Sequence, residues 1–177
     1  MLIIGIDPGY AITGYGIIRY EGNHFTTIDY GVISTKAGTP FELRLLQISL
    51  SLDSLLERYH PDIMAIEELF FSRNTTTAIG TAQARGVLIL SAAKQNMPVF
   101  EYTPMQVKSA VTGYGRADKA QVGQMVKVLL NLEKAPKIDD AADALAIAIC
   151  QAHSGLVTQN KAVGGYQYGP KGKRDFF

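Results

Sequence analysis

Short apolar runs alternate with polar turns through the first 34 residues and predict β-strands. Leu2–Asp7, Gly14–Tyr20 and His24–Ser34 are rich in β-branched and aromatic residues. Only short segments separate them, and such spacing is typical of antiparallel hairpins. We therefore expect three consecutive antiparallel strands, the first of which ends in a lone acid followed by Pro8 and Gly9.

After these strands the apolar positions change to the spacing of amphipathic helices. Two further short apolar runs, Asp62–Glu67 and Pro98–Tyr102, interrupt the helical pattern and predict additional strands. Helices are expected from Thr39-Pro40 to about Arg58, from Asn74 to about Asn96, from Thr103-Pro104 to the loop Gly113–Arg116, from Ala117 or Asp118 to about Asn131, and from Ile138 to Ser154.

This order of elements predicts one α/β domain over residues 1–154. Its mixed sheet should be antiparallel in the first three strands and parallel in the later ones, with helices on its faces. Residues 155–177 are rich in Gly and Lys and show little periodicity. We expect them to form a flexible basic C-terminal tail.

Composition and charge narrow the class of protein. The chain has 177 residues, of which 47% are hydrophobic and 19% charged, with a formal net charge of +1. Any nucleic-acid surface must therefore come from local clustering of basic residues. Cys150 is the single cysteine, and the sequence has no signal-peptide pattern and no apolar run of about 18 residues. These features favour a cytoplasmic protein without a membrane segment.

Four carboxylates stand out because their neighbours are apolar. Asp7 follows LIIGI, Glu67 follows IMAI, and Asp140 and Asp143 lie in DDAADALAIAI. Residues three apart share one face of a helix, so Asp140 and Asp143 can point to one place. Strand ends and helices commonly meet at one edge of an α/β sheet, where sites form.

Carboxylates that are brought together repel one another, and a divalent cation relieves that repulsion. Oxygen ligands suit Mg²⁺ or Mn²⁺, and one ion or a pair of ions could promote phosphodiester hydrolysis. The sequence has no His and Cys spacing typical of zinc sites.

Each acid also has a simpler explanation. An Asp before Pro-Gly commonly bonds the backbone of its own turn, as Asp7 could. Asp140 or its neighbour Asp139 could complement a helix dipole. Glu67, next to Glu68, could be a solvated strand end. A shared site accounts for all of these acids at once.

Several longer motifs carry a resemblance to a known family. GIDPG with TGYG close behind is followed in order by AIEELFFSRN, QARG, VFEYTPMQVKSAVTGYGRADKAQV and DDAADALAIAI. From about Leu2 to His153 the chain resembles the RuvC family, the bacterial Holliday-junction resolvases. The resemblance implies a ribonuclease-H-like fold, a homodimer, and a Mg²⁺-dependent endonuclease that cuts four-way DNA junctions in recombination and repair. It also implies a branch-migration motor as a partner.

The resemblance places the family's catalytic and metal-binding acids on Asp7, Glu67, Asp140 and Asp143. Glu68 is an additional acid beside the expected one. The resemblance also places the long helix from Asn74 to Asn96, whose only charges are Arg85 and Lys94, at the two-fold dimer interface, although its composition also suits a buried core.

Candidate DNA contacts come partly from the resemblance and partly from charge. The resemblance assigns Lys108 and Lys119 near the site and Phe70, beside Phe71, as an aromatic that stacks on a base. From Thr103 to Leu130, four basic residues (Lys108, Arg116, Lys119, Lys127) stand against Asp118 alone, a local charge of 4 − 1 = +3. Such a cluster suits phosphate contacts, although Lys127 fits an ordinary solvated helix face.

Two other functions remain open at this point. IDPGYAITGYG also resembles the first phosphate motif of actin-like ATPases and sugar kinases, which need a second lobe and a second phosphate loop. A junction-binding module without catalysis is the other possibility, and the complete set of four acids disfavours it.

Overall fold

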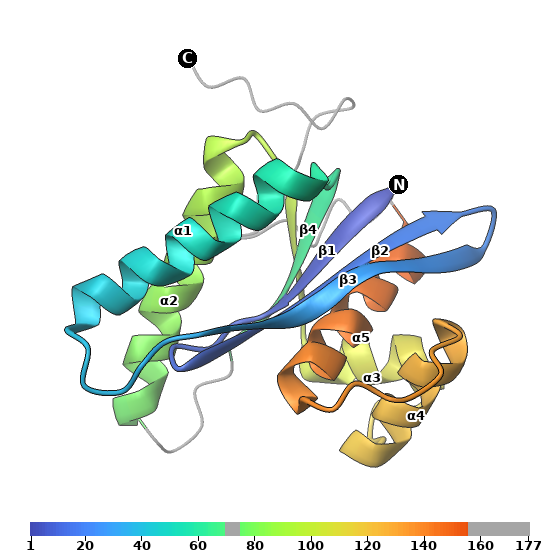
Figure 1. Cartoon of the computed structure of the whole chain (residues 1–177). Helices are drawn as coiled ribbons and strands as arrows, with labels where there is room; N and C mark the ends of the chain where they lie inside the picture. Colours follow the sequence, from blue (N-terminus) through green and yellow to red (C-terminus); the bar gives the residue numbers. More distant parts are fainter. Residues whose placement is uncertain (70–74, 156–177) are drawn as a thin grey trace.

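The computed structural model describes residues 1–69 and 75–155. Five strands form one mixed sheet in the order β3-β2-β1-β4-β5 (Figure 1). They are β1 (Leu2–Asp7), β2 (Ile12–Glu21), β3 (His24–Ser34), β4 (Ile63–Glu67) and β5 (Val99–Tyr102). The pairs β1–β2 and β2–β3 are antiparallel, whereas β1–β4 and β4–β5 are parallel. This confirms the predicted mixed sheet.

Helices cover both faces of the sheet. The pair α1 (Phe41–Tyr59) and α2 (Thr75–Lys94) lies on one face. The other face is covered by α3 (Pro104–Thr112), α4 (Lys119–Leu129) and α5 (Asp139–Ser154) (Figure 1). Of these three, α5 packs directly against the central strands β1 and β2.

The two-residue period of the strands divides the core into two clusters. In β1, Ile4 and Ile6 pack toward α1 and α2, whereas Ile3 packs toward α5. Gly5 lies between Ile4 and Ile6 and faces α5, where an added Cβ would meet the backbone of Ala144. Asp7 is the next residue on the α5 face. The lone acid at the end of this strand therefore belongs to the same layer as α5.

Local signals explain where the helices begin and end. His60 stops α1 with a left-handed φ of 48° and donates its backbone N–H to Leu56. Thr103 caps α3 and Asp118 caps α4, each in a reciprocal bond with a glutamine three residues later. Gly113 ends α3 with a φ of 75°, so the glycine of the predicted loop serves the turn.

The observed bounds lie within a few residues of those predicted. For example, β2 begins at Ile12 rather than Gly14 because Ile12 and Thr13 pair with the end of β3. Three predictions lie outside the described residues: Phe70 as a DNA contact, Asn74 as a helix cap, and the basic tail beyond Gly155. Within residues 1–69 and 75–155, no helix has the length and apolarity needed to cross a bilayer.

Candidate active site

Asp7 and Glu67 lie side by side at the carboxyl ends of the adjacent strands β1 and β4. Parallel pairing places Ile6 opposite Ile66, and each strand then continues by one residue to its acid. Ile63 and Ala65 of β4 pack toward α5, and Glu67 follows in the same alternation. Both carboxylates line a cavity of about 310 Å³. This confirms that the two strand-terminal acids are brought together.

The first turns of α5 bring the remaining two acids to this edge. Asp143 lines the same cavity, and Asp140 lies near enough to act electrostatically on Asp7. The approach of α5 depends on glycine in the strands beneath it. A Cβ on Gly14, the cross-strand partner of Asp7, would lie 2.0 Å from the carbonyl oxygen of Asp140. Only glycine therefore allows α5 to sit this close to the strand ends.

Burial and mutual repulsion strongly perturb two of the carboxyl groups. The pKa of Asp7 is raised from 3.8 to about 7, first by burial and then by the charges of Glu67, Asp143 and Asp140. The pKa of Glu67 is raised from 4.5 to about 7, first by burial and then by Asp143. Such shifts mark sites where negative charge is concentrated at a cost to the fold.

Two lysines share the cavity with these acids. Lys108 of α3 and Lys119 of α4 both line it, and both lower the pKa of Glu67. The Lys119 Nζ donates to Asp143 Oδ2 at 3.1 Å and lies 4.0 Å from Asp139 Oδ2. Its bond to Asp143 is the main cause of the raised pKa of Lys119. The cavity therefore holds both signs of charge.

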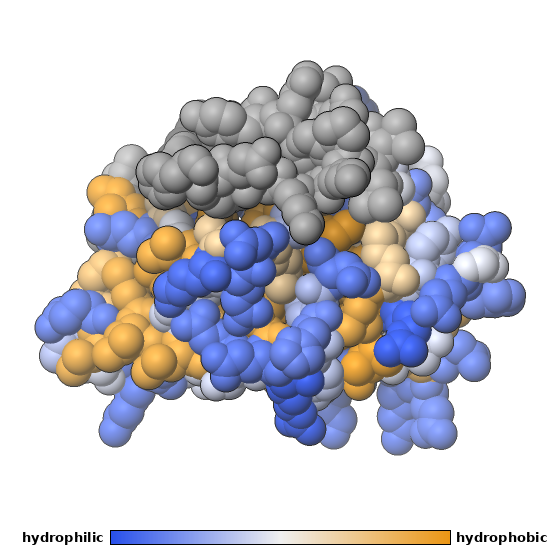
Figure 2. Space-filling view, turned by 90° about the horizontal axis from the view of Figure 1, so that it is seen from above, coloured by the Kyte–Doolittle hydropathy of each residue, from blue (hydrophilic) through white to orange (hydrophobic). Residues whose placement is uncertain are grey.

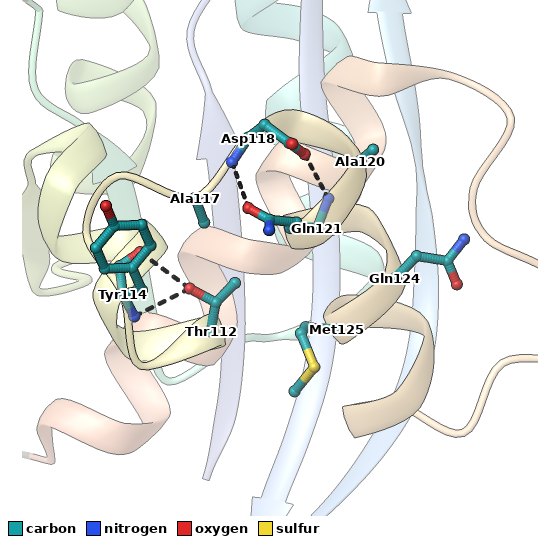
Figure 3. A pocket seen from close by; sticks show the side chains of 8 residues that line it. All are labelled: Thr112, Tyr114, Ala117, Asp118, Ala120, Gln121, Gln124 and Met125. Atoms are coloured by element: carbon teal, nitrogen blue, oxygen red, sulfur yellow. Dashed lines mark hydrogen bonds between the residues drawn. The ribbon is translucent and has the colours of Figure 1, made fainter.

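The start of α4 sets the place of Lys119, which is the first residue of that helix. Asp118 Oδ1 accepts a bond from the Gln121 amide at 2.8 Å, and the Asp118 amide donates to Gln121 Oε1 at 2.9 Å (Figure 3). Ala117, just before the cap, is only 1% exposed. The cap and this buried anchor fix the helix terminus from which Lys119 extends.

The other predicted residues lie in different places. Arg116 is exposed in the loop before α4 and does not line the carboxylate cavity. The same loop borders a second cavity of about 510 Å³, lined by Tyr114 and the capping pair (Figure 3). Glu68 is exposed, and its backbone N–H donates to the Tyr102 carbonyl at 2.9 Å. Glu67, rather than Glu68, is therefore the acid in the cavity.

Within residues 1–69 and 75–155, no three His, Cys, Asp or Glu side chains form a ready-made metal cluster. Asp7, Glu67 and Asp143 line one cavity, whereas Asp140 lies outside its lining, and the ammonium group of Lys119 bonds to the Asp143 carboxylate there. The arrangement is thus an acidic cavity with an internal counter-charge.

Arg85 of α2 is a residue near this site to which the sequence interpretation gave no role. Its Nε donates to the main-chain carbonyl of Glu67 at 3.1 Å, and its Nη2 pairs with Glu101 Oε1. Arg85 belongs to the QARG motif and is one of two charged residues in α2. A charge in the middle of a helix whose other charge, Lys94, lies in its last turn was the available signal.

Comparison with known proteins agrees with the resemblance that the motifs carry. Residues 3–151 match the family of the crossover junction endodeoxyribonuclease RuvC. The chain belongs to the RuvC family. The RuvC of Alkaliphilus metalliredigens (strain QYMF) is 61% identical over 155 residues, which cover 88% of this chain and 94% of that protein. The RuvC of Clostridioides difficile (strain 630) is 53% identical over 166 residues, which cover 93% of this chain and 98% of that protein.

Solved RuvC structures share the fold. Thermus thermophilus RuvC in complex with a Holliday junction substrate has a TM-score of 0.87 and 34% identity, over 92% of this chain and 99% of that one. The yeast mitochondrial Holliday junction resolvase Ydc2 has a TM-score of 0.62 over 85% of this chain and 77% of its own, at 16% identity, and supports the fold alone. The predicted resemblance to RuvC and the ribonuclease-H-like fold are both confirmed.

Proposed function

We propose that this RuvC-family chain resolves four-way DNA junctions by hydrolysing phosphodiester bonds, and that Asp7, Glu67, Asp140 and Asp143 are its catalytic carboxylates. The observation that carries the proposal is the meeting of β1, β4 and α5 at one cavity, where acids from all three elements face two lysines. A junction-binding module would have no need to concentrate carboxylates at this cost in repulsion.

The donor set fits a hard divalent cation. Asp7 and Glu67 have pKa values near 7 because they are buried among like charges, and a cation relieves that repulsion. All four side chains offer carboxylate oxygen, which suits Mg²⁺, with Mn²⁺ as a substitute. We infer that these four residues hold one or two such ions per subunit. When bound, the ions would supply positive charge at the scissile phosphate and promote ionisation of the attacking water.

The remaining steps belong to the side chains of the chain itself. Lys108 and Lys119 lie in the cavity, where their ammonium groups can attract and orient the DNA phosphate. Arg116, exposed in the neighbouring loop, would contact a phosphate further along the strand. In-line attack on phosphorus would then leave 5′-phosphate and 3′-hydroxyl ends that a ligase can seal.

One experiment separates cutting from binding. The purified chain is incubated with a synthetic four-way junction, or with linear duplex of the same arm sequence, in Mg²⁺ or in EDTA. We expect paired, symmetric nicks in the junction with Mg²⁺ only, and little cutting of the duplex. Junction binding without nicks at any Mg²⁺ or Mn²⁺ concentration would indicate a binding module instead.

Lys119→Ala should slow cleavage and reduce the salt dependence of junction binding. Removal of one phosphate contact lowers the slope of log K against log salt concentration by about 1. Lys127→Ala, in the last turn of the same helix, is the matched control for a basic residue that does not line the cavity. The measurement is binding by fluorescence anisotropy at several salt concentrations. An unchanged slope and rate would remove Lys119 from the phosphate contacts.

A homodimer is supported by the outer face of α2. Its inner face buries Ala84, Leu88 and Ala92 in the core. On the outer face, exposed uncharged residues recur with helical spacing at Ile79, Gln83, Gly86 and Leu90. Ile79 is 61% exposed and Leu90 is 57% exposed. In Figure 2, apolar surface gathers on the left, the side on which α1 and α2 lie. A two-fold contact through α2 would cover such a stripe and supply one active site for each of two strands.

Leu90→Glu should therefore convert the dimer to a monomer. Across a two-fold axis the substitution introduces like charges and removes apolar contact from both subunits at once. Sedimentation equilibrium at several protein concentrations measures the effect, and paired cutting should give way to single nicks. Val128→Glu, at an exposed position of α4, is the control. A Leu90→Glu variant that stays dimeric would place the interface elsewhere.

A further inference from the structure

Arg85 connects α2 to the strand end that carries Glu67, from the opposite side of the sheet. Its Nε donates to the Glu67 carbonyl oxygen at 3.1 Å, whereas the Glu67 side chain lies in the cavity on the α5 side. The other arm of the guanidinium group, Nη2, pairs with Glu101 Oε1. The side chains of Arg85 and Glu101 are only 14% and 23% exposed, so solvent competes weakly with both contacts.

The partner of Arg85 is itself fixed in the sheet. Glu101 lies on β5 directly opposite Ile66 of β4, one residue before the acid. Arg85 therefore bridges two adjacent strands at the point where β4 ends. The planar guanidinium group can make both bonds at once because its donors have a fixed fork geometry, which the single nitrogen of a lysine lacks.

A tether is needed at this point because Glu67 lies among like charges. The Asp143 carboxylate repels the Glu67 carboxylate, and burial disfavours its charged form. At a strand terminus both forces can be relieved by rotation of the backbone, which would swing the side chain away from Asp7. A hydrogen bond from a charged donor to the Glu67 carbonyl opposes that rotation.

We propose that Arg85 is a positioning residue that holds the end of β4 from the α2 side and thereby sets the place of the Glu67 carboxylate. This inference rests on the proposed function, in which Glu67 is a catalytic carboxylate. Arg85 acts through the Glu67 backbone and does not contact the DNA. Because Arg85 belongs to α2, the tether also joins the proposed dimer helix to the active site of its own subunit.

The test compares variants that separate the hydrogen bond from Arg85 to the Glu67 carbonyl from the ion pair between Arg85 and Glu101. Arg85→Ala removes both, Glu101→Gln removes the charge pair but keeps an acceptor for Nη2, and the double variant Arg85→Ala/Glu101→Gln removes both without leaving an unpaired charge. Arg85→Lys keeps the charge pair and supports the fold. Each is assayed for single-turnover cleavage in Mg²⁺, for junction binding in EDTA, and for the rise in melting temperature caused by Mn²⁺ without DNA.

We expect Arg85→Ala and the double variant to cleave about 10- to 100-fold more slowly, as for other residues that orient a metal ligand. Both should also show a smaller Mn²⁺-induced rise in melting temperature, with junction affinity and its salt dependence unchanged. Glu101→Gln should cleave at close to the wild-type rate. Arg85→Lys should recover the melting temperature of the metal-free protein but not the cleavage rate.

Three results would overturn the inference. The first is that Arg85→Ala cleaves at the wild-type rate, and the second is that the double variant cleaves as fast as Glu101→Gln. The third is that junction binding by Arg85→Ala depends less steeply on salt concentration than binding by the wild type. Glu67→Gln is assayed in parallel, so that failure of the role of Arg85 can be distinguished from failure of the proposed function. An active Glu67→Gln would refute the catalytic assignment itself. An inactive Glu67→Gln beside a fully active Arg85→Ala would refute only the role of Arg85.

Discussion

Asp7→Asn is expected to abolish junction cleavage while leaving junction binding intact. Asparagine has nearly the same shape as aspartate, so the end of β1 and its Pro-Gly turn should persist. The substitution removes one negative charge from the centre of the acidic cavity, where Asp7 lies beside Glu67. Because a carboxylate in the metal site has no substitute, the rate should fall by about 1000-fold or more.

The same substitution should stabilise the metal-free protein above neutral pH. The pKa of Asp7 is about 7 in the folded chain but 3.8 for an ordinary aspartate. The ionised carboxylate therefore destabilises the fold, and this penalty grows as the pH rises from about 4 to 7 and is then constant. Asparagine removes the penalty. Melting temperatures in EDTA should rise by several degrees at pH values above 7 and change little near pH 4.

The control for Asp7→Asn is Glu68→Gln, which neutralises an exposed acid next to Glu67 that does not line the cavity. It should cleave at close to the wild-type rate, with no pH-dependent gain in stability. Cleavage by Asp7→Asn at the wild-type rate would contradict the assignment of the catalytic acids. A melting temperature unaffected at high pH would show that Asp7 carries no electrostatic strain.

Gly14→Ala should damage both the fold and the site through one added methyl group. The new Cβ would lie 2.0 Å from the carbonyl oxygen of Asp140 and 2.5 Å from its carbonyl carbon. These are backbone atoms, so the start of α5 must move away from the sheet. We expect a loss of about 1–3 kcal/mol in the free energy of unfolding. Displacement of Asp140 and Asp143 should slow cleavage by roughly 100-fold.

Gly123→Ala is the matched control, because an added Cβ in α4 at this position meets nothing within 4 Å. Alanine is the better helix former, and this variant should gain up to about 1 kcal/mol. Urea unfolding and single-turnover cleavage measure the two effects. If Gly14→Ala were as stable and active as Gly123→Ala, α5 would not owe its position to the bare backbone of β2.

The strands and the acids at their ends could be predicted because both depend on local pattern. The apolar run from Leu2 to Ile6 predicts a buried strand, and Asp7 marks its polar end, where it can serve the Pro-Gly turn or a site. Similar reasoning applies to Glu67. The spacing of Asp140 and Asp143 gives one helix face wherever that helix packs.

The contacts that position these acids could not be predicted, because they join residues far apart in the chain. Nothing in the sequence around Gly14 indicates that a Cβ added to Gly14 would lie 2.0 Å from the carbonyl oxygen of Asp140. Arg85 could be noticed as a charge in the middle of a nearly uncharged helix, but its partners depend on the sheet order. That order, with β4 between β1 and β5, brings the Glu67 carbonyl and Glu101 within reach of one guanidinium group.

The sequence by itself thus predicted the elements, the mixed sheet, the family and the four candidate acids, because periodicity and motifs are local properties. Tertiary structure alone decided how closely α5 approaches the sheet and what holds the end of β4. Those features depend on the registers of β1 with β4 and β4 with β5, and on which face each strand residue presents. A shift of one residue between β1 and β4 would put Asp7 and Glu67 on opposite faces and separate the acids, and a shift between β4 and β5 would turn Glu101 away from Arg85.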